Sequence, residues 1–215
     1  MGRLSYWASW ILPLVGMALA YTVLAWSSET DTTGKAWMAI GFAFVVVLWS
    51  VFRILVDQTA LARAVASADT PRILAIAGKQ LARRKDPIKR GPFLVYRAYA
   101  LEWQGDHAGA LAALDEAKLI DPGLLALAAA ILVLALIEKG DTAAARRTLD
   151  EQLEPRIAKL DARLHAAPHM HALLARGRLL LAEGKRDEAK QVLQKVIDDI
   201  RAGAVLRERA KKLAA

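Results

Sequence analysis

The hydrophobic positions divide the chain into an apolar N-terminal part and a longer part with helical periodicity. Residues 6–26 form an apolar run without a charged residue. As a helix this run would cover about 30 Å, the thickness of the hydrocarbon core of a bilayer. A second run, residues 36–56, contains a single charged residue, Arg53, whose long side chain can reach the headgroups. We therefore predict a two-helix transmembrane hairpin over residues 1–56, with spans at about 6–26 and 36–56.

An alternative for the first run is a cleaved signal peptide. Arg3 precedes the run, and the triplet Ala18-Leu19-Ala20 has the small residues of a cleavage site. The run continues to Trp26, however, which is longer than the usual hydrophobic region of a signal peptide. We therefore prefer a membrane span.

Aromatic residues stand at both ends of the predicted spans. Amphipathic rings favour the headgroup depth of a bilayer, so this placement supports two spans. The residues are Tyr6, Trp7, Trp10 and Trp49 at one expected interface, and Trp26 and Trp37 at the other.

Lysine and arginine residues are distributed unequally around the predicted spans. The connecting loop, residues 27–35, has one lysine and two acidic residues, whereas Arg53, Arg63 and Arg72 accompany the end of the second span. The positive-inside rule then places both termini on the cytoplasmic side. We expect an integral membrane protein of a bacterial inner membrane, with its repeat domain in the cytoplasm.

The remainder, residues 57–215, contains several copies of one pattern and no β-type alternation bounded by turn residues. In the three clear copies a glycine is followed by alanine five residues later and by leucine nine residues later. Glycine allows a sharp turn between two helices, alanine allows close packing, and leucine fills the core. We expect an Asp-Pro pair to stop the second helix. The copies are Gly105, Ala110 and Leu114; Gly140, Ala145 and Leu149; Gly184, Ala189 and Leu193; and a weaker copy at 69–87.

These copies resemble the tetratricopeptide repeat (TPR). The first clear copy has Ala98, Leu101, Gly105, Ala110, Leu114, Ala117 and Pro122 in the signature places, and the last has Gly177, Leu180, Gly184, Ala189 and Leu193. The middle copy departs from the pattern at Gln152 and has an insertion near residues 157–168. The resemblance covers roughly residues 58–200. It implies an all-α fold in which the transmembrane hairpin precedes a TPR-like α-solenoid, residues 57–215, of about three to four antiparallel helix pairs, the first degenerate.

Similarity to TPR proteins implies a binding scaffold whose first helices line a concave groove, and it implies no catalysis. These groove positions are not the combination of Lys, Asn and Arg residues by which some TPR domains clamp a C-terminal carboxylate. A mainly apolar groove suits an amphipathic helix or apolar segment of a partner. The alternative is that these residues pack within the domain, against the C-terminal helix. The positions are Val95, Tyr99, Glu102 and Trp103; Leu127, Leu134 and Ile137; and His171, Leu174, Arg178 and Leu181.

Residues 124–137 are apolar on every face of a helix. A third membrane span is disfavoured because this length would cover only about 21 Å. A helix that is apolar all round is buried all round. Either neighbouring repeats enclose it, or one face is left for a partner.

The net charge of +8 comes from the part of the chain after the predicted spans. A basic cluster within it could contact anionic lipid headgroups or an acidic partner. The alternative is an ordinary solvated face. Nucleic acid is disfavoured because no reading motif accompanies the cluster. Its residues are Arg83, Arg84, Lys85, Lys89 and Arg90.

Residues with catalytic or metal-binding chemistry are scarce. The absence of cysteine excludes disulfides, iron–sulfur clusters and thiolate chemistry. Ser67 is the one serine after the predicted spans. His165, His169 and His171 have a loosely metal-like spacing, but Pro168 interrupts it, so we expect a loop and a helix start. We predict no catalytic residues, no metal and no cofactor.

The sequence leads to the hypothesis of a membrane-anchored TPR scaffold or assembly subunit. Its expected partners are the bilayer and protein subunits of a larger membrane complex. An alternative is a periplasm-facing chaperone or biogenesis factor, of the TPR type that acts in cytochrome c maturation. That function requires the opposite topology. A membrane-bound enzyme is disfavoured by the missing nucleophiles and metal ligands.

Overall fold

The computed structural model describes residues 16, 41, 43–49 and 59–215. The chain divides into two compact units, Met1–Ala60 and Leu61–Ala215. The predicted membrane spans fall almost entirely outside the described residues. Within the described ranges, no helix is both long enough and apolar enough to cross a bilayer.

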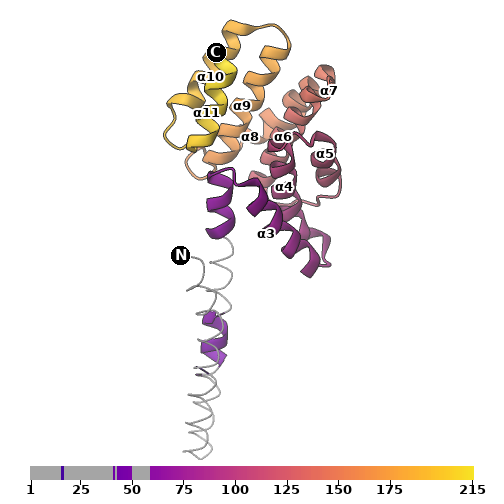
Figure 1. Cartoon of the computed structure of the whole chain (residues 1–215), viewed down its shortest axis with the longest axis vertical. Coiled ribbons are helices and arrows are strands. Elements are labelled where there is room, and N and C mark those ends of the chain that lie inside the picture. Colours follow the sequence, from indigo (N-terminus) through magenta and orange to yellow (C-terminus); the bar gives the residue numbers. More distant parts are fainter. Residues whose placement is uncertain (1–15, 17–40, 42, 50–58) are drawn as a thin grey trace, which may run out of the picture. The chain divides into compact units, whose positions relative to one another are not determined.

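The second unit is built of helices joined by short turns (Figure 1). A helical stretch at residues 61–66 comes first, and no strand occurs between residues 61 and 215. Neighbouring helices pair as hairpins, so the predicted all-helical, TPR-like arrangement is confirmed for this part of the chain. The helices are α3 (Thr70–Arg83), α4 (Pro87–Trp103), α5 (His107–Asp115), α6 (Pro122–Glu138), α7 (Thr142–Thr148), α9 (Ala166–Ala182), α10 (Arg186–Asp198) and α11 (Ala204–Ala214).

The glycines of the repeat pattern lie at the turns inside the hairpins, as predicted. Gly105, Gly140 and Gly184 have φ angles of 81°, 84° and 80°, in the left-handed region that residues with a Cβ rarely adopt. Each glycine ends the first helix of its pair. The alanines that follow five residues later are fully buried, so the two helices of each pair pack closely.

The Asp-Pro pairs act differently from the prediction. They begin the next helix instead of ending the previous one, since α5 already ends at Asp115. Asp86 and Asp121 are the residues that cap α4 and α6, and each carboxylate accepts a hydrogen bond from a backbone N–H of the first turn. The prolines that follow need no amide hydrogen at the first helical position.

The middle hairpin has the predicted irregularity. After α7 the helix continues as a π-helix, η1 (Leu149–Leu153), and then as α8 (Glu154–Ile157). A loop at residues 158–165 leads to α9. The insertion therefore lengthens the second helix of the pair and the loop after it.

Helix α6 is the central helix of the second unit. It packs against α4, α5, α7 and α9. Every residue from 123 to 137 is buried or half-buried, which explains why the helix is apolar on all faces. Neighbouring helices therefore enclose it, and only its two end residues, Pro122 and Glu138, are exposed.

Candidate protein-binding groove

The predicted groove residues come from α4, α6 and α9, the first helices of the three hairpins. Most are buried in the domain: Val95, Tyr99, Glu102, Leu127, Leu134, His171 and Leu174. Trp103, Ile137, Arg178 and Leu181 are half-buried, and Arg178 forms an ion pair with Glu138 at 2.7 Å. The four half-buried residues lie toward the C-terminal ends of their helices.

The C-terminal helix α11 packs onto the groove. Its apolar positions Leu206, Ala210 and Leu213 follow a helical spacing. Leu206 and Ala210 are buried in the same hydrophobic cluster as Leu134 and Leu174, and Leu213 packs against that cluster. The chain itself therefore covers part of the surface that the TPR resemblance assigns to a partner.

Arg209 connects α11 to α4 through a buried ion pair. Its guanidinium donates to both carboxylate oxygens of Glu102, at 2.8 and 2.5 Å. The Glu102 side chain is 1% exposed and the Arg209 side chain 24%. The guanidinium also lies 4.6 Å from the ring centroid of Trp103, a cation–π contact. Glu102, which looks out of place in an apolar groove, is thus explained by a partner in the same chain.

Tyr99 and His171 lie next to this ion pair. Their rings meet edge to face, with centroids 5.3 Å apart. Burial, followed by the charge of Arg209, lowers the pKa of His171 to about 4, so its imidazole is neutral at pH 7. Burial, followed by the charge of Glu102, raises the pKa of Tyr99 above its usual value. Neither ring carries a charge in the folded domain.

A pocket of about 600 Å³ opens beside the start of α11. We call it the α11 pocket. Its walls come from residues 62–66, α4, α6, α9 and α11. No sequence motif marks these residues, so the sequence did not predict the pocket. Its apolar lining includes Val65, Leu124, Leu127, Met170, Val205 and Leu206, and its polar lining includes Tyr96, His165, His171 and Arg201.

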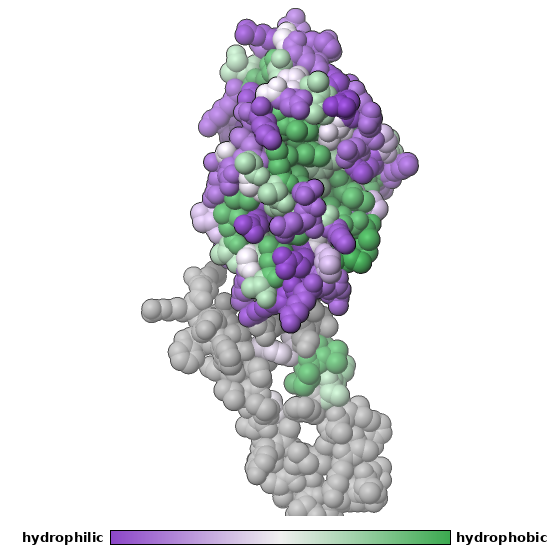
Figure 2. Space-filling model, turned by 90° about the vertical axis from the view of Figure 1, so that its right-hand side faces the viewer, coloured by the Kyte–Doolittle hydropathy of each residue, from purple (hydrophilic) through white to green (hydrophobic). Residues whose placement is uncertain are grey.

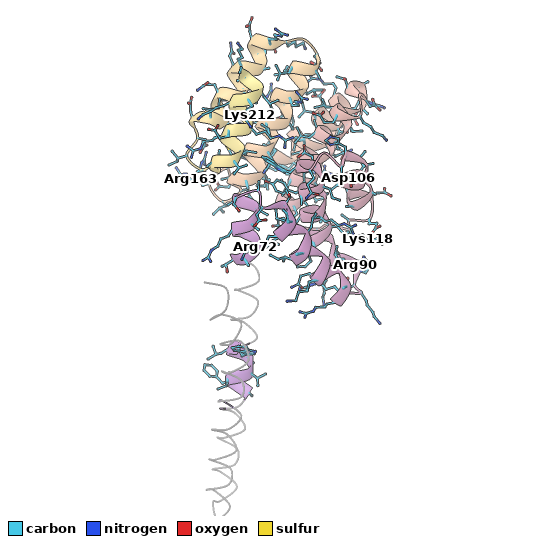
Figure 3. The ribbon with its side chains drawn as sticks, viewed as in Figure 1. Arg72, Arg90, Asp106, Lys118, Arg163 and Lys212 are labelled. Carbon is cyan, nitrogen blue, oxygen red and sulfur yellow. The ribbon has the colours of Figure 1, made fainter. Side chains whose placement is uncertain are left out.

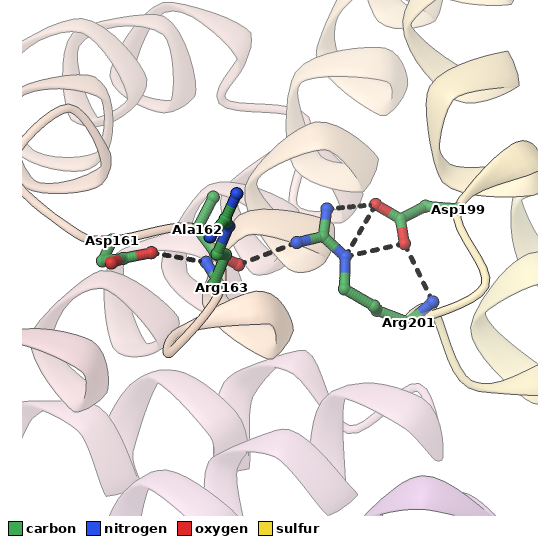
Figure 4. Close-up of polar contacts among 5 residues, drawn as sticks. All are labelled: Asp161, Ala162, Arg163, Asp199 and Arg201. Carbon is green, nitrogen blue, oxygen red and sulfur yellow. Dashed lines mark hydrogen bonds and ion pairs between the residues drawn. The ribbon is translucent and has the colours of Figure 1, made fainter.

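Two loops at the rim of the α11 pocket are tied together by Arg201 (Figure 4). Its guanidinium pairs with Asp199 at 2.5 Å and donates to the backbone carbonyl of Ala162 at 3.0 Å. Leu164 lines the pocket and is 80% exposed, and Ile200 beside Arg201 is 88% exposed. The rim therefore carries large apolar side chains in open solvent.

The histidines of the 165–171 segment lie at a helix start, as the sequence predicts. His165 is the residue before α9, and Pro168 falls in its first turn. His165 and His171 line the α11 pocket, whereas His169 does not. In residues 59–215 no group of histidine and acidic side chains is arranged to hold a metal ion.

The predicted basic cluster lies at the end of α3 and the start of α4. Arg84 is partly engaged, because it hydrogen-bonds to Gln80 and lies 4.8 Å from the ring centroid of Phe93. Arg83, Lys85 and Lys89 are exposed and Arg90 is half-exposed. Figure 3 shows Lys118 near Arg90 at the same end of the domain. A Cβ built on Gly91 would meet the carbonyl oxygen of Lys118, so the two segments touch.

Comparisons with known proteins identify the repeat. Residues 171–199, which cover most of α9 and α10, match the tetratricopeptide repeat family. No curated protein and no solved structure matches the chain. The chain therefore contains a tetratricopeptide repeat at residues 171–199, within a set of TPR-like helical hairpins.

Proposed function

We propose that this protein is a membrane-anchored TPR scaffold that binds protein partners in a larger membrane complex. The observation that carries the binding part is the repeat itself. A TPR presents the faces of stacked hairpins to other proteins and supplies no reactive groups. The membrane part is supported by the apolar runs in the sequence and by exposed residues in the first unit.

The described part of the first unit carries five consecutive large apolar side chains. Residues 43–49 are helical, and the side chains of 44–48 are between 46% and 62% exposed. A Cβ built on Gly16 would lie 3.6 Å from Cγ1 of Val45, which is van der Waals contact between the first and second apolar runs. Such exposed apolar surface is stable in lipid or against another protein, and costly in water.

The surface we assign to partners lies at the C-terminal ends of α4, α6 and α9. Trp103, Ile137 and Leu181 are half-buried there, so each keeps an accessible apolar surface while α11 is in place. Half-buried aromatic and aliphatic side chains of this kind are suited to anchor a partner segment. Figure 2 shows a different face, the side of the second unit that carries α5 and α7, where hydrophobic residues are bordered by polar ones.

Copurification tests the scaffold function. The tagged full chain, extracted from membranes in a mild detergent, should retain a partner protein. Leu181→Glu places a charge on the assigned surface and should reduce the amount of that partner at least tenfold. Gln191→Glu, at an exposed position of α10, is the control and should retain it. Equal recovery with both variants would contradict the assigned surface, provided that both have wild-type circular dichroism.

A reporter fused after Ala215 tests the proposed topology. The positive-inside rule predicts activity of a cytoplasmic reporter and no activity of an exported one. Activity of the exported reporter alone would contradict the cytoplasmic topology and favour the periplasm-facing biogenesis factor.

A further inference from the structure

The α11 pocket has the size and lining of a small-molecule site. Its volume of about 600 Å³ falls within the range of ligand pockets, about 300–1,000 Å³. Apolar side chains from residues 62–66, α6, α9 and α11 dominate its walls. A few polar groups face the same space, which is the composition that ligand pockets share.

Helix α11 limits what the pocket can accept. A partner helix lying along the groove would have to displace α11 and break the ion pair between Arg209 and Glu102. The Glu102 carboxylate is 1% exposed, so its separation from Arg209 would leave a buried charge unpaired. With α11 in place, the pocket therefore accepts a small molecule that enters beside this helix.

His171 supplies a hydrogen-bonding group in the wall of the α11 pocket. The side chain is 6% exposed and lines the α11 pocket. Its ring meets the ring of Tyr99 edge to face, which fixes the orientation of the imidazole beside the pocket. A neutral imidazole has one donor and one acceptor nitrogen, so it can form a hydrogen bond with a hydroxyl or carbonyl group of a bound molecule.

The charges around the pocket favour a neutral ligand. Arg201 is the one arginine in the lining, and it already pairs with Asp199 and donates to Ala162. Asp121, the acidic residue of the lining, accepts the capping hydrogen bond of Leu124 at 2.8 Å. A charged ligand would lose its hydration in the pocket, and Arg201 is already paired, so it could not neutralise the ligand's charge.

We propose that the α11 pocket binds a small apolar molecule that carries one hydroxyl or carbonyl group, and that His171 forms the hydrogen bond to that group. The apolar part of the ligand packs against Leu124, Leu127 and Met170. The partner surface lies at the other ends of α6 and α9, whereas on α4 the pocket residue Tyr99 contacts Trp103 of that surface.

Photolabelling of the purified full chain tests the proposal. The probe is 1-decanol with a diazirine in its chain, and the controls are the corresponding alkane and carboxylate probes in the same detergent. The alcohol should label peptides from the starts of α6 and α9 more strongly than either control. His171→Phe keeps an aromatic ring beside Tyr99 but loses the hydrogen bond, and should reduce this labelling about three- to tenfold.

A pocket-filling variant and its matched control complete the test. Ala167→Trp, at an exposed pocket position of α9, should reduce labelling to background. Ala182→Trp, at an exposed position at the other end of α9 outside the pocket, should label like wild type. The same preparations are checked for copurifying partner. The proposal would be overturned if Ala167→Trp were labelled as strongly as wild type, or if the carboxylate probe labelled wild type more strongly than the alcohol probe. A third result would also overturn it: the Ala167→Trp variant loses the copurifying partner, and the alcohol probe does not label wild type. The pocket would then hold a side chain of the partner protein.

Discussion

At the scale of single residues, charged and polar side chains are paired or kept neutral inside an apolar domain. Glu102 and Arg209 are separated by 107 positions in the sequence and still form the most buried ion pair between separate helices. His171 is buried beside them and neutral. Both features concern folding energy, so both can be tested by unfolding measurements.

Removal of Arg209 alone should be strongly destabilising. Arg209→Met leaves the Glu102 carboxylate buried without its partner, which should lower the free energy of unfolding by about 3 kcal/mol. The double variant with Glu102→Leu removes both charges and should recover most of that loss. Urea unfolding followed by circular dichroism measures both values. A double variant as unstable as Arg209→Met would show that the ion pair is not the source of the effect.

His171 should make stability depend on pH. Its folded pKa of about 4 lies below the ordinary value of 6.5, so the unfolded chain takes up the proton first. The stability contributed by the neutral ring is complete above pH 6.5 and decreases by about 3 kcal/mol as the pH falls to 4. Unfolding midpoints at several pH values should show this decrease in wild type and a smaller one in His171→Phe. Identical pH profiles would contradict it.

At the scale of helices, close packing within the last hairpin requires a glycine. A Cβ built on Gly177 of α9 would lie 2.6 and 2.7 Å from the Cδ2 and Cγ atoms of Leu193 in α10, which is fully buried. In α3, by contrast, a Cβ built on Gly78 would meet nothing within 4 Å. Both glycines carry the same entropic cost of glycine in a helix, but the space beside Gly177 is filled and the space beside Gly78 is open.

Alanine substitutions at these two glycines should therefore change stability in opposite directions. Gly177→Ala should lower the free energy of unfolding by about 1–3 kcal/mol through steric overlap with Leu193. Gly78→Ala should raise it by about 0.5–1 kcal/mol, because glycine in a helix interior costs conformational entropy. Thermal unfolding of both variants measures the two shifts. A stabilising Gly177→Ala would contradict the close approach of α9 and α10.

Local signals predicted the hairpins, whereas long-range contacts determined the candidate site. Gly105, Gly140 and Gly184 could be interpreted from sequence because a turn glycine acts within a few residues. The predicted role of the Asp-Pro pairs was wrong, because aspartate is also a favoured residue before a helix and proline a favoured first residue within one. The covering of the groove by α11 could not be predicted, since Arg209 and Glu102 share no period or motif. The α11 pocket is space left between packed helices, which no sequence pattern encodes.

At the scale of the whole molecule, the second unit joins a repeat scaffold to its own terminal helix. Helix α11 covers the middle of the groove and leaves apolar side chains accessible at the ends of α4, α6 and α9. We propose that a protein partner binds at those ends while the first unit anchors the chain in a membrane. The basic cluster at residues 83–90 remains a prediction for lipid or acidic protein.

The central claim is that the ends of α4, α6 and α9 contact a partner protein in the membrane. A photoreactive benzoylphenylalanine in place of Leu181 tests it most directly when intact membranes are irradiated. We expect a discrete crosslinked product from position 181 and none from position 191, which is exposed on α10. No product from position 181, or the same products from both positions, would contradict the account.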